Sequence, residues 1–150
     1  MIRAYVIGTE DNTGAEKRYS AGAVYELNGQ IVFSNAVTRF DREGLGKSGA
    51  GICGAIMAIQ DCFNLQQFTG DDNVIISVYD EDVVALGEGG DPENDFEGIL
   101  LEYILEMSEK MTLSFEMPYQ GQEDQMNKAL DLAKQALKEP SYERSVRSAV

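Results

Sequence analysis

Alternating apolar and polar positions at the beginning of the chain predict three strands. Residues 2–9 are rich in β-branched and aromatic side chains, residues 21–27 alternate, and residues 30–39 continue the pattern. Asn28-Gly29, a dipeptide that strongly favours a tight hairpin, separates the last two runs. We therefore expect an antiparallel meander of three strands.

After the glycine-rich segment 41–51, the apolar spacing becomes that of helices and buried strands. Ile52, Ile56, Ile59 and Phe63 recur at helical intervals, and the run 73–79 is typical of a strand buried on both faces. Residues 83–86 fit a short helical turn, a strand is expected at 111–117, and Asp91-Pro92 fits the cap and first turn of a helix. The later helices have apolar positions at Phe96, Leu100, Tyr103, Ile104 and Met107, and at Met126, Leu130, Ala133 and Leu137.

The resulting order is β-β-β-α-β-α-β-α, which predicts an α/β fold with a five-stranded mixed sheet. A chain of 150 residues is long enough for one core, so we expect a single domain over residues 1–138 and a C-terminal tail at 139–150. Functional sites in such folds tend to form at the carboxyl ends of the central strands. Gly51 and Gly54 are expected to allow close packing of a helix on the sheet.

Composition excludes several kinds of catalytic site. The chain has no histidine, which rules out serine–histidine and cysteine–histidine catalysis and ordinary zinc sites. Cys53 and Cys62 lie nine residues apart in one predicted helix, too far for a disulfide. Reduced cysteines and the lack of a long apolar run lead us to expect a cytoplasmic protein with no membrane partner.

The negative charge is confined to one half of the chain. Residues 48–109 contain 14 acidic residues and no lysine or arginine, whereas the rest has 12 basic and 12 acidic residues. The 14 acids therefore equal the net charge of −14. Such a surface repels nucleic acid phosphates and attracts cations or basic protein surfaces. The alternative is that it serves only solubility.

Three short motifs lie at the ends of predicted strands or in the last predicted helix: Thr9-Glu10, Ser77-Val78-Tyr79-Asp80, and Asn127 with Asp131. Together with the element order they resemble the ribonuclease H-like superfamily over residues 1–138. Thr9-Glu10 follows the first strand, where that family typically has threonine and aspartate. Ser77-Val78-Tyr79-Asp80, followed by Val83-Val84, is similar to the family's fourth strand end, acid and short helix. Asn127 and Asp131 keep the asparagine–aspartate spacing of its terminal helix.

This resemblance implies a divalent-metal site of Mg or Mn held by Glu10, Asp80 and Asp131. In the family, carboxylates hold two metals that activate water and stabilise the leaving oxygen of a phosphodiester. The family's glutamate in the first helix, which bridges the two metals, is missing here, because residues 48–54 contain no acid. Glu43, in the preceding loop, is the candidate to compensate as a metal ligand, and Gln120 is the nearest polar substitute for the family's mobile histidine.

Other motifs have plainer explanations. Gly46-Lys47-Ser48 resembles a phosphate loop but lacks the glycine five residues earlier, where Asp41 stands. Residues 80–82 lack the spacing of a calcium loop, so a helix cap is expected there. Five cations near the first three strands make only a weak nucleic acid-binding set; they are Lys17, Arg18, Arg39, Arg42 and Lys47.

Two functional hypotheses follow, with a third held behind them. The first is a ribonuclease H-like domain with reduced hydrolysis, whose acidic half binds a basic or nucleic acid-binding protein and could mimic nucleic acid. The second is a metal-dependent endonuclease that cleaves RNA in RNA/DNA hybrids through Glu10, Asp80 and Asp131, with Glu43 compensating. The third is a structural protein that oligomerises through an exposed sheet edge.

Overall fold

Three long strands form the centre of the structure. The computed structural model describes residues 1–138 in full and residues 144–149 by their backbone alone. Strands β1 (Ile2–Asp11), β2 (Arg18–Leu27) and β3 (Gln30–Phe40) pair antiparallel in sequence. Asn28 and Gly29 turn β2 into β3 with φ values of 52° and 85°, as the hairpin prediction requires.

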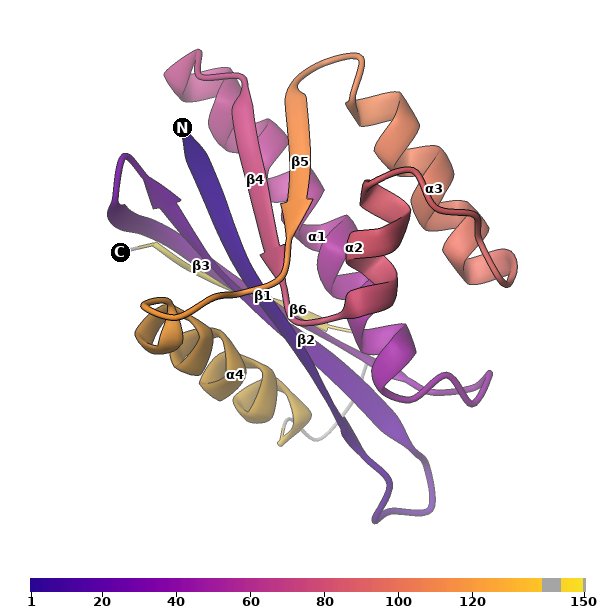
Figure 1. The fold of residues 1–150 in the computed structure, drawn as a ribbon. Coiled ribbons are helices and arrows are strands. Elements are labelled where there is room, and N and C mark those ends of the chain that lie inside the picture. Colours follow the sequence, from indigo (N-terminus) through magenta and orange to yellow (C-terminus); the bar gives the residue numbers. More distant parts are fainter. Residues whose placement is uncertain (139–143, 150) are drawn as a thin grey trace.

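Helices and strands then alternate in the predicted order (Figure 1). The elements are α1 (Lys47–Thr69), β4 (Asn73–Val78), α2 (Glu81–Gly87), α3 (Asp95–Met107), β5 (Thr112–Glu116), α4 (Glu123–Leu137) and β6 (Arg144–Ala149). The sheet has the order β5-β4-β1-β2-β3-β6, with β4 parallel to both β1 and β5. The mixed α/β sheet is therefore confirmed.

The sheet has one strand more than expected. Residues 144–149, which lie in the segment expected to be a tail, pair antiparallel with β3 as β6. The remainder of that segment, residues 139–143 and 150, lies outside the described residues. The pairing gives β3 a hydrogen-bonded neighbour on its outer side, so β3 does not form the edge of the sheet.

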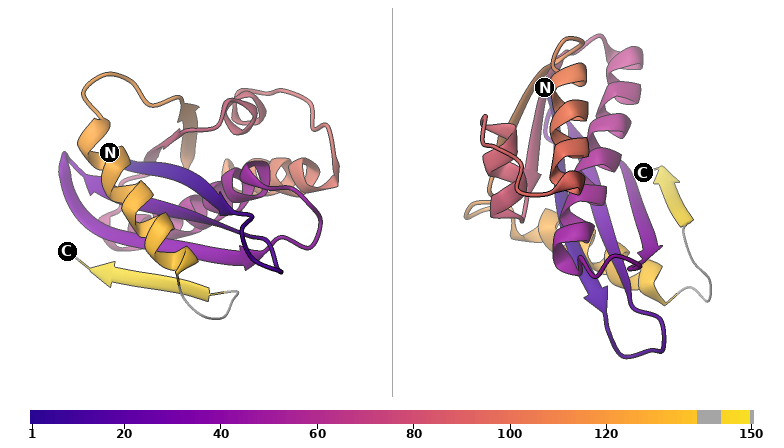
Figure 2. Two further views of the ribbon diagram at one scale, coloured as in Figure 1. Left: turned by 90° about the horizontal axis from the view of Figure 1, so that it is seen from below. Right: turned by 90° about the vertical axis from the view of Figure 1, so that its right-hand side faces the viewer.

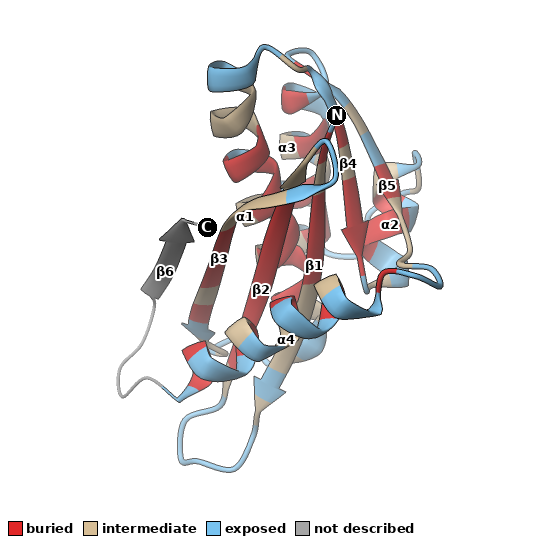
Figure 3. Ribbon diagram, turned by 90° about the vertical axis from the view of Figure 1, so that its left-hand side faces the viewer, coloured by how far each residue is buried: buried red, intermediate tan, exposed pale blue. Residues whose placement is uncertain are grey.

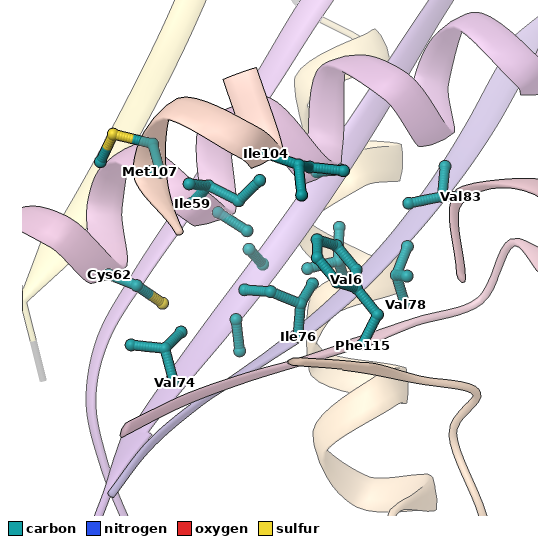
Figure 4. Close-up of a cluster of buried hydrophobic side chains, with 14 of the residues drawn as sticks. Val6, Ile59, Cys62, Val74, Ile76, Val78, Val83, Ile104, Met107 and Phe115 are labelled. Carbon is teal, nitrogen blue, oxygen red and sulfur yellow. The ribbon is translucent and has the colours of Figure 1, made fainter. Parts of the chain in front are cut away.

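The helices cover both faces of the sheet. Helices α1, α2 and α3 lie on one face and α4 crosses the other, over β1 and β2 (Figures 1 and 2). The central strands are accordingly buried along most of their length (Figure 3). The main core lies between α1, α3 and the sheet, where Val6, Ile59, Ile76 and Ile104 pack together (Figure 4).

The start of α3 differs from the prediction. The helix begins at Asp95, and its cap is Asn94, not Asp91. Asn94 Oδ1 accepts from Glu97 N at 2.9 Å, and Glu97 Oε1 accepts from Glu93 N at 3.0 Å. These two bonds satisfy backbone donors around the first turn, which explains why the helix starts three residues after Pro92.

None of the helices in the described part of the chain is long and apolar enough to cross a membrane. Cys53 and Cys62 are both unpaired, as their positions in one helix predict.

Helix α4 reaches the sheet through Gly22 on β2. A Cβ atom at this position would overlap the carbonyl oxygen of Ala129 and lie 2.9 Å from Ala133 N. Ser20 Oγ also donates to Ala133 O at 2.5 Å. Because the obstacle is helix backbone, it cannot move aside as a flexible side chain would.

Replacing Gly22 should therefore destabilise the protein. We expect Gly22→Ala to lower the free energy of unfolding by about 1–3 kcal/mol, because α4 must shift away from β2. The measurement is urea unfolding followed by circular dichroism. Gly14→Ala is the matched control, since its Cβ would have no neighbour closer than 3.6 Å. Equal stability of the two variants would contradict the close contact.

Candidate functional site

Asp80 directly follows β4 and caps the next helix. Tyr79 N donates to Val6 O, which holds the end of β4 against β1. Asp80 Oδ1 accepts from Asp82 N at 3.0 Å and from Val83 N at 3.1 Å. The expectation of a helix cap at residues 80–82 is confirmed, so one carboxylate oxygen of Asp80 already serves α2.

The other carboxylate oxygen of Asp80 lies against Gly51 of α1. A Cβ atom on Gly51 would overlap Asp80 Oδ2 and lie 2.9 Å from Asp80 Cγ. Residue 51 is therefore the position in the first helix that faces the end of β4. It falls within the segment where the ribonuclease H-like resemblance implies a glutamate, and it has no side chain.

Gly8 of β1 lines the same pocket as Asp80. Val6 and Val78 are the last pair in the parallel pairing of β1 with β4, and Gly8 and Asp80 each lie two residues beyond that pair. A Cβ atom on Gly8 would lie 2.5 Å from Ala50 Cβ, because α1 rests directly on the strand. Gly8, Gly51 and Asp80 line one pocket of about 280 Å³, together with Lys47, Ser48, Val78, Tyr79 and Asp82.

The surroundings of Asp80 disfavour its charged form. Burial raises the pKa of Asp80 above its ordinary value of 3.8, while the hydrogen bonds from Val83 and Asp82 oppose this shift. The charges of Asp82 and Glu97 raise it further. Lys47 is the one basic residue among the described residues that line the pocket.

The other predicted metal ligands, Glu10, Asp131 and Glu43, do not line the pocket with Asp80. Glu10 lies two residues beyond Gly8, and its carboxylate sits over Gly46, where a Cβ atom would lie 2.5 Å from Glu10 Oε2. Gly46 and Gly51 are five residues apart, which corresponds to ~7.5 Å along a helix axis. Glu10 and Asp80 thus lie over different turns at the start of α1.

Asp131 and Glu43 are both solvent-exposed, and neither lines the pocket around Asp80. Over residues 1–138, no group of three or more aspartate, glutamate, cysteine or histidine residues could hold a metal ion. Bridging two metals requires several carboxylates that converge on one point. The residues present do not fit the two-metal site that the resemblance implies, because two glycines line the pocket with Asp80.

Gly8 and Gly51 are the site residues that sequence reasoning missed. Thr9-Glu10 is similar to the family's threonine–aspartate pair, but the residue of β1 that lines the pocket with Asp80 is Gly8. Gly51 and Gly54 were expected only to allow close packing of the helix on the sheet. This is confirmed for Gly54, whose Cβ atom would meet Ala21 and Val6, whereas Gly51 lies against Asp80.

Comparison with known proteins gives matches at the level of structure only. No family model matches the chain, and no curated protein does. The solved structure of LC11-RNase H1 in complex with an RNA/DNA hybrid is 18% identical, with a TM-score of 0.69, over 91% of this chain and 96% of that one. RNase H1 from the halophilic archaeon Halobacterium salinarum NRC-1 is 17% identical, with a TM-score of 0.66 and the same coverage.

A viral enzyme shares the fold over part of its length. The foamy viral protease-reverse transcriptase in complex with an RNA/DNA hybrid is 14% identical, with a TM-score of 0.68, over 91% of this chain and 20% of that one. At these identities the matches show that the fold is shared, as the motifs and the element order predicted.

Asp80 should act mainly as a cap. We expect Asp80→Ala to lower the free energy of unfolding by about 0.5–2 kcal/mol through loss of the cap, and Asp80→Asn to keep the cap. Because the pKa of Asp80 is raised in the folded state, its ionisation is unfavourable to folding. Asp80→Asn should therefore be at least as stable as the parent protein at pH 7.

The pH dependence checks this assignment. The stability advantage of Asp80→Asn should shrink as the pH falls through the raised pKa of Asp80, because the parent carboxyl group then becomes neutral as well. Urea unfolding at pH 7, 5 and 4 measures the difference. An Asn variant that is clearly less stable than the parent at pH 7 would show that the charge itself is needed.

Proposed function

We propose that this chain, which has the ribonuclease H-like fold, acts by binding a cationic protein partner and does not hydrolyse nucleic acid. The observation that carries the first half of the proposal is the pair of glycines, Gly8 and Gly51, that line the pocket with Asp80, Gly51 directly against its carboxylate. A single half-buried carboxylate with a raised pKa, one oxygen of which caps a helix, is a poor ligand for divalent cations.

The room needed for further carboxylates is also taken. An aspartate at position 8 would collide with Ala50, and a side chain at position 51 would displace the carboxylate of Asp80. The obstacle at position 8 is a helix residue held by the core, since Ala50 is fully buried. The absence of carboxylates at positions 8 and 51 and the close packing of α1 on β1 therefore both disfavour a two-metal site.

The second half of the proposal rests on charge. Helices α2 and α3 and the segments around them expose nine acids with no lysine or arginine between residues 81 and 109; these acids are Glu81, Asp82, Glu88, Asp91, Glu93, Asp95, Glu102, Glu106 and Glu109. Like charges this dense repel one another, and a basic protein surface relieves that repulsion on binding.

The competing function is a metal-dependent nuclease that uses Glu10, Asp80, Asp131 and Glu43. The fold favours it, because two of the matched structures hold an RNA/DNA hybrid. The exposed positions of Asp131 and Glu43, away from the pocket at Asp80, count against it.

A cleavage assay separates the two functions. We expect no cleavage of an RNA/DNA hybrid by the purified protein with Mg²⁺ or Mn²⁺, and no rise in melting temperature with either metal, because the ligands do not converge. Asp80→Asn is the control for a contaminating nuclease. Metal-dependent cleavage by the parent protein that is absent in Asp80→Asn would overturn the proposal.

A second experiment tests the acidic surface. A peptide of alternating lysine and alanine should bind the protein, and its affinity should fall steeply between 50 and 300 mM salt, because exposed charges are screened within ~10 Å at 0.1 M. The variant Glu102→Gln, Glu106→Gln, Glu109→Gln should weaken this binding. Isothermal titration calorimetry measures both effects.

The matched control removes three charges elsewhere. Glu16, Asp124 and Asp131 are exposed and lie outside residues 81–109, so their change to Gln, Asn and Asn alters the net charge equally. The control should bind the peptide more tightly than the variant Glu102→Gln, Glu106→Gln, Glu109→Gln does. Equal weakening by both triple variants would mean that net charge alone attracts the peptide.

A further inference from the structure

A groove of about 390 Å³ lies between the end of β4 and the beginning of α4, on the sheet face opposite α1. It is lined by Ile7, Tyr79, Pro118, Tyr119, Gln120, Gln122, Glu123, Met126, Asn127 and Leu130. The segment from β5 to α4 crosses beside the end of β4 and the middle of β1 (Figure 1). Its residues Pro118, Tyr119, Gln120 and Gln122 line the groove. The groove has no part in the cap at Asp80 or in the acidic surface of α2 and α3.

Two exposed tyrosines flank an apolar floor. Tyr79 and Tyr119 are 60% and 54% exposed, and both line the groove. The groove is also lined by Ile7, Met126 and Leu130, which are buried or half-buried. Rings exposed next to an apolar cleft are typical of binding surfaces, because tyrosine buries a large area and keeps a polar end in water.

Tyr119 is held in place from below by a polar network. Its backbone N donates to Gln122 Oε1 at 3.2 Å, and Gln122, only 4% exposed, donates from Nε2 to Glu116 Oε2 at 3.4 Å. Glu116 also accepts from Ser77 Oγ and pairs with Arg3 at 3.7 Å. The Arg3 guanidinium lies 5.9 Å from the centre of the Tyr119 ring.

The network holds the backbone of Tyr119, and the Arg3 guanidinium lies over its exposed ring. A side chain already ordered before binding loses less conformational entropy when a partner arrives. The groove is therefore built as a preformed contact surface.

The charges around the groove indicate which partner fits. Glu123 lines it, and no lysine or arginine does so among the described residues. Tyr79 also lines the neighbouring pocket with Asp80 and Asp82, where Lys47 is the one cation among the described residues. Because Tyr79 lines both the groove and that pocket, a partner in the groove lies close to the carboxylates of Glu123 and of the pocket.

We infer that this groove binds an extended, basic protein segment that carries proline or aliphatic residues beside its lysines or arginines. The inference rests on the proposed function and assigns that function a docking site. Extended proline-containing segments fit grooves lined by exposed aromatic rings, since they lose little entropy on binding. The amides of Gln120 and Asn127 can bond the segment's backbone, and Glu123 and Asp82 its cations.

Single-stranded RNA is the other polymer that stacks on exposed tyrosines. Its phosphates would lie against Glu123, and none of the described residues that line the groove is basic. The observations therefore favour a basic peptide.

Selection from a library of random 12-residue peptides displayed on phage tests the inference. Peptides enriched on the immobilised protein should carry net positive charge together with proline or aliphatic residues. Dissociation constants of the synthesised peptides, measured by fluorescence anisotropy, should rise about tenfold or more in Tyr79→Ser and Tyr119→Ser. Enrichment of neutral or acidic peptides would overturn the inference.

The controls separate the groove from the proposed function. Ile99→Ser and Leu105→Ser remove exposed apolar side chains of α3 and should leave binding unchanged. If basic peptides bind but lose affinity only in the variant Glu102→Gln, Glu106→Gln, Glu109→Gln, the groove is not their binding site, and the proposal of a cationic partner remains. If no basic peptide binds, both fail. Tighter binding of a 12-nucleotide single-stranded RNA than of the peptides, lost in Tyr119→Ser, would overturn the inference in favour of RNA.

Discussion

The close contact between the N-terminal half of α1 and strand β1 is the constraint on which the other features depend. Gly8 lies against Ala50, and Gly51 lies against the carboxylate of Asp80, so a side chain at position 8 would collide with the helix and one at position 51 with the acid. A metal pair would need carboxylates in that space. The same packing that stabilises the sheet therefore closes the place where this fold could hold hydrolytic metals.

Some polar side chains hold the fold together, and others are exposed to solvent. Asp80 caps α2, and Glu116 and Gln122 support Tyr119 beneath the groove. The exposed acids of α2 and α3 have no such duty in the described structure and form a continuous anionic region in sequence. Binding, more than catalysis, is what this distribution of rigid and charged groups suits.

The sequence was sufficient for the element order, because period-two and helical spacing are local signals, and for the Asn28-Gly29 hairpin and the cap at Asp80. It could not give the register of β1 against β4, in which Gly8 and Asp80 both lie two residues beyond the last pair, so that Gly8 and not Glu10 lines the pocket with Asp80. Helix α3 is capped by Asn94 because Asn94 and Glu97 together accept from the backbone donors of the first turn. Strand β6 was not predicted because its residues lack an apolar pattern. The groove at Tyr119 depends on contacts of Glu116 with Arg3 and Ser77, which are distant from it in sequence.

The claim that Asp80 faces a site unable to hold two divalent cations is tested most directly by titrating Mn²⁺ into ¹⁵N-labelled protein and following paramagnetic broadening of the amide signals. The account predicts weak, unsaturated broadening spread over residues 81–109, where the exposed acids lie. Saturable broadening centred on Gly8, Gly51 and Asp80 at low metal concentration would contradict it.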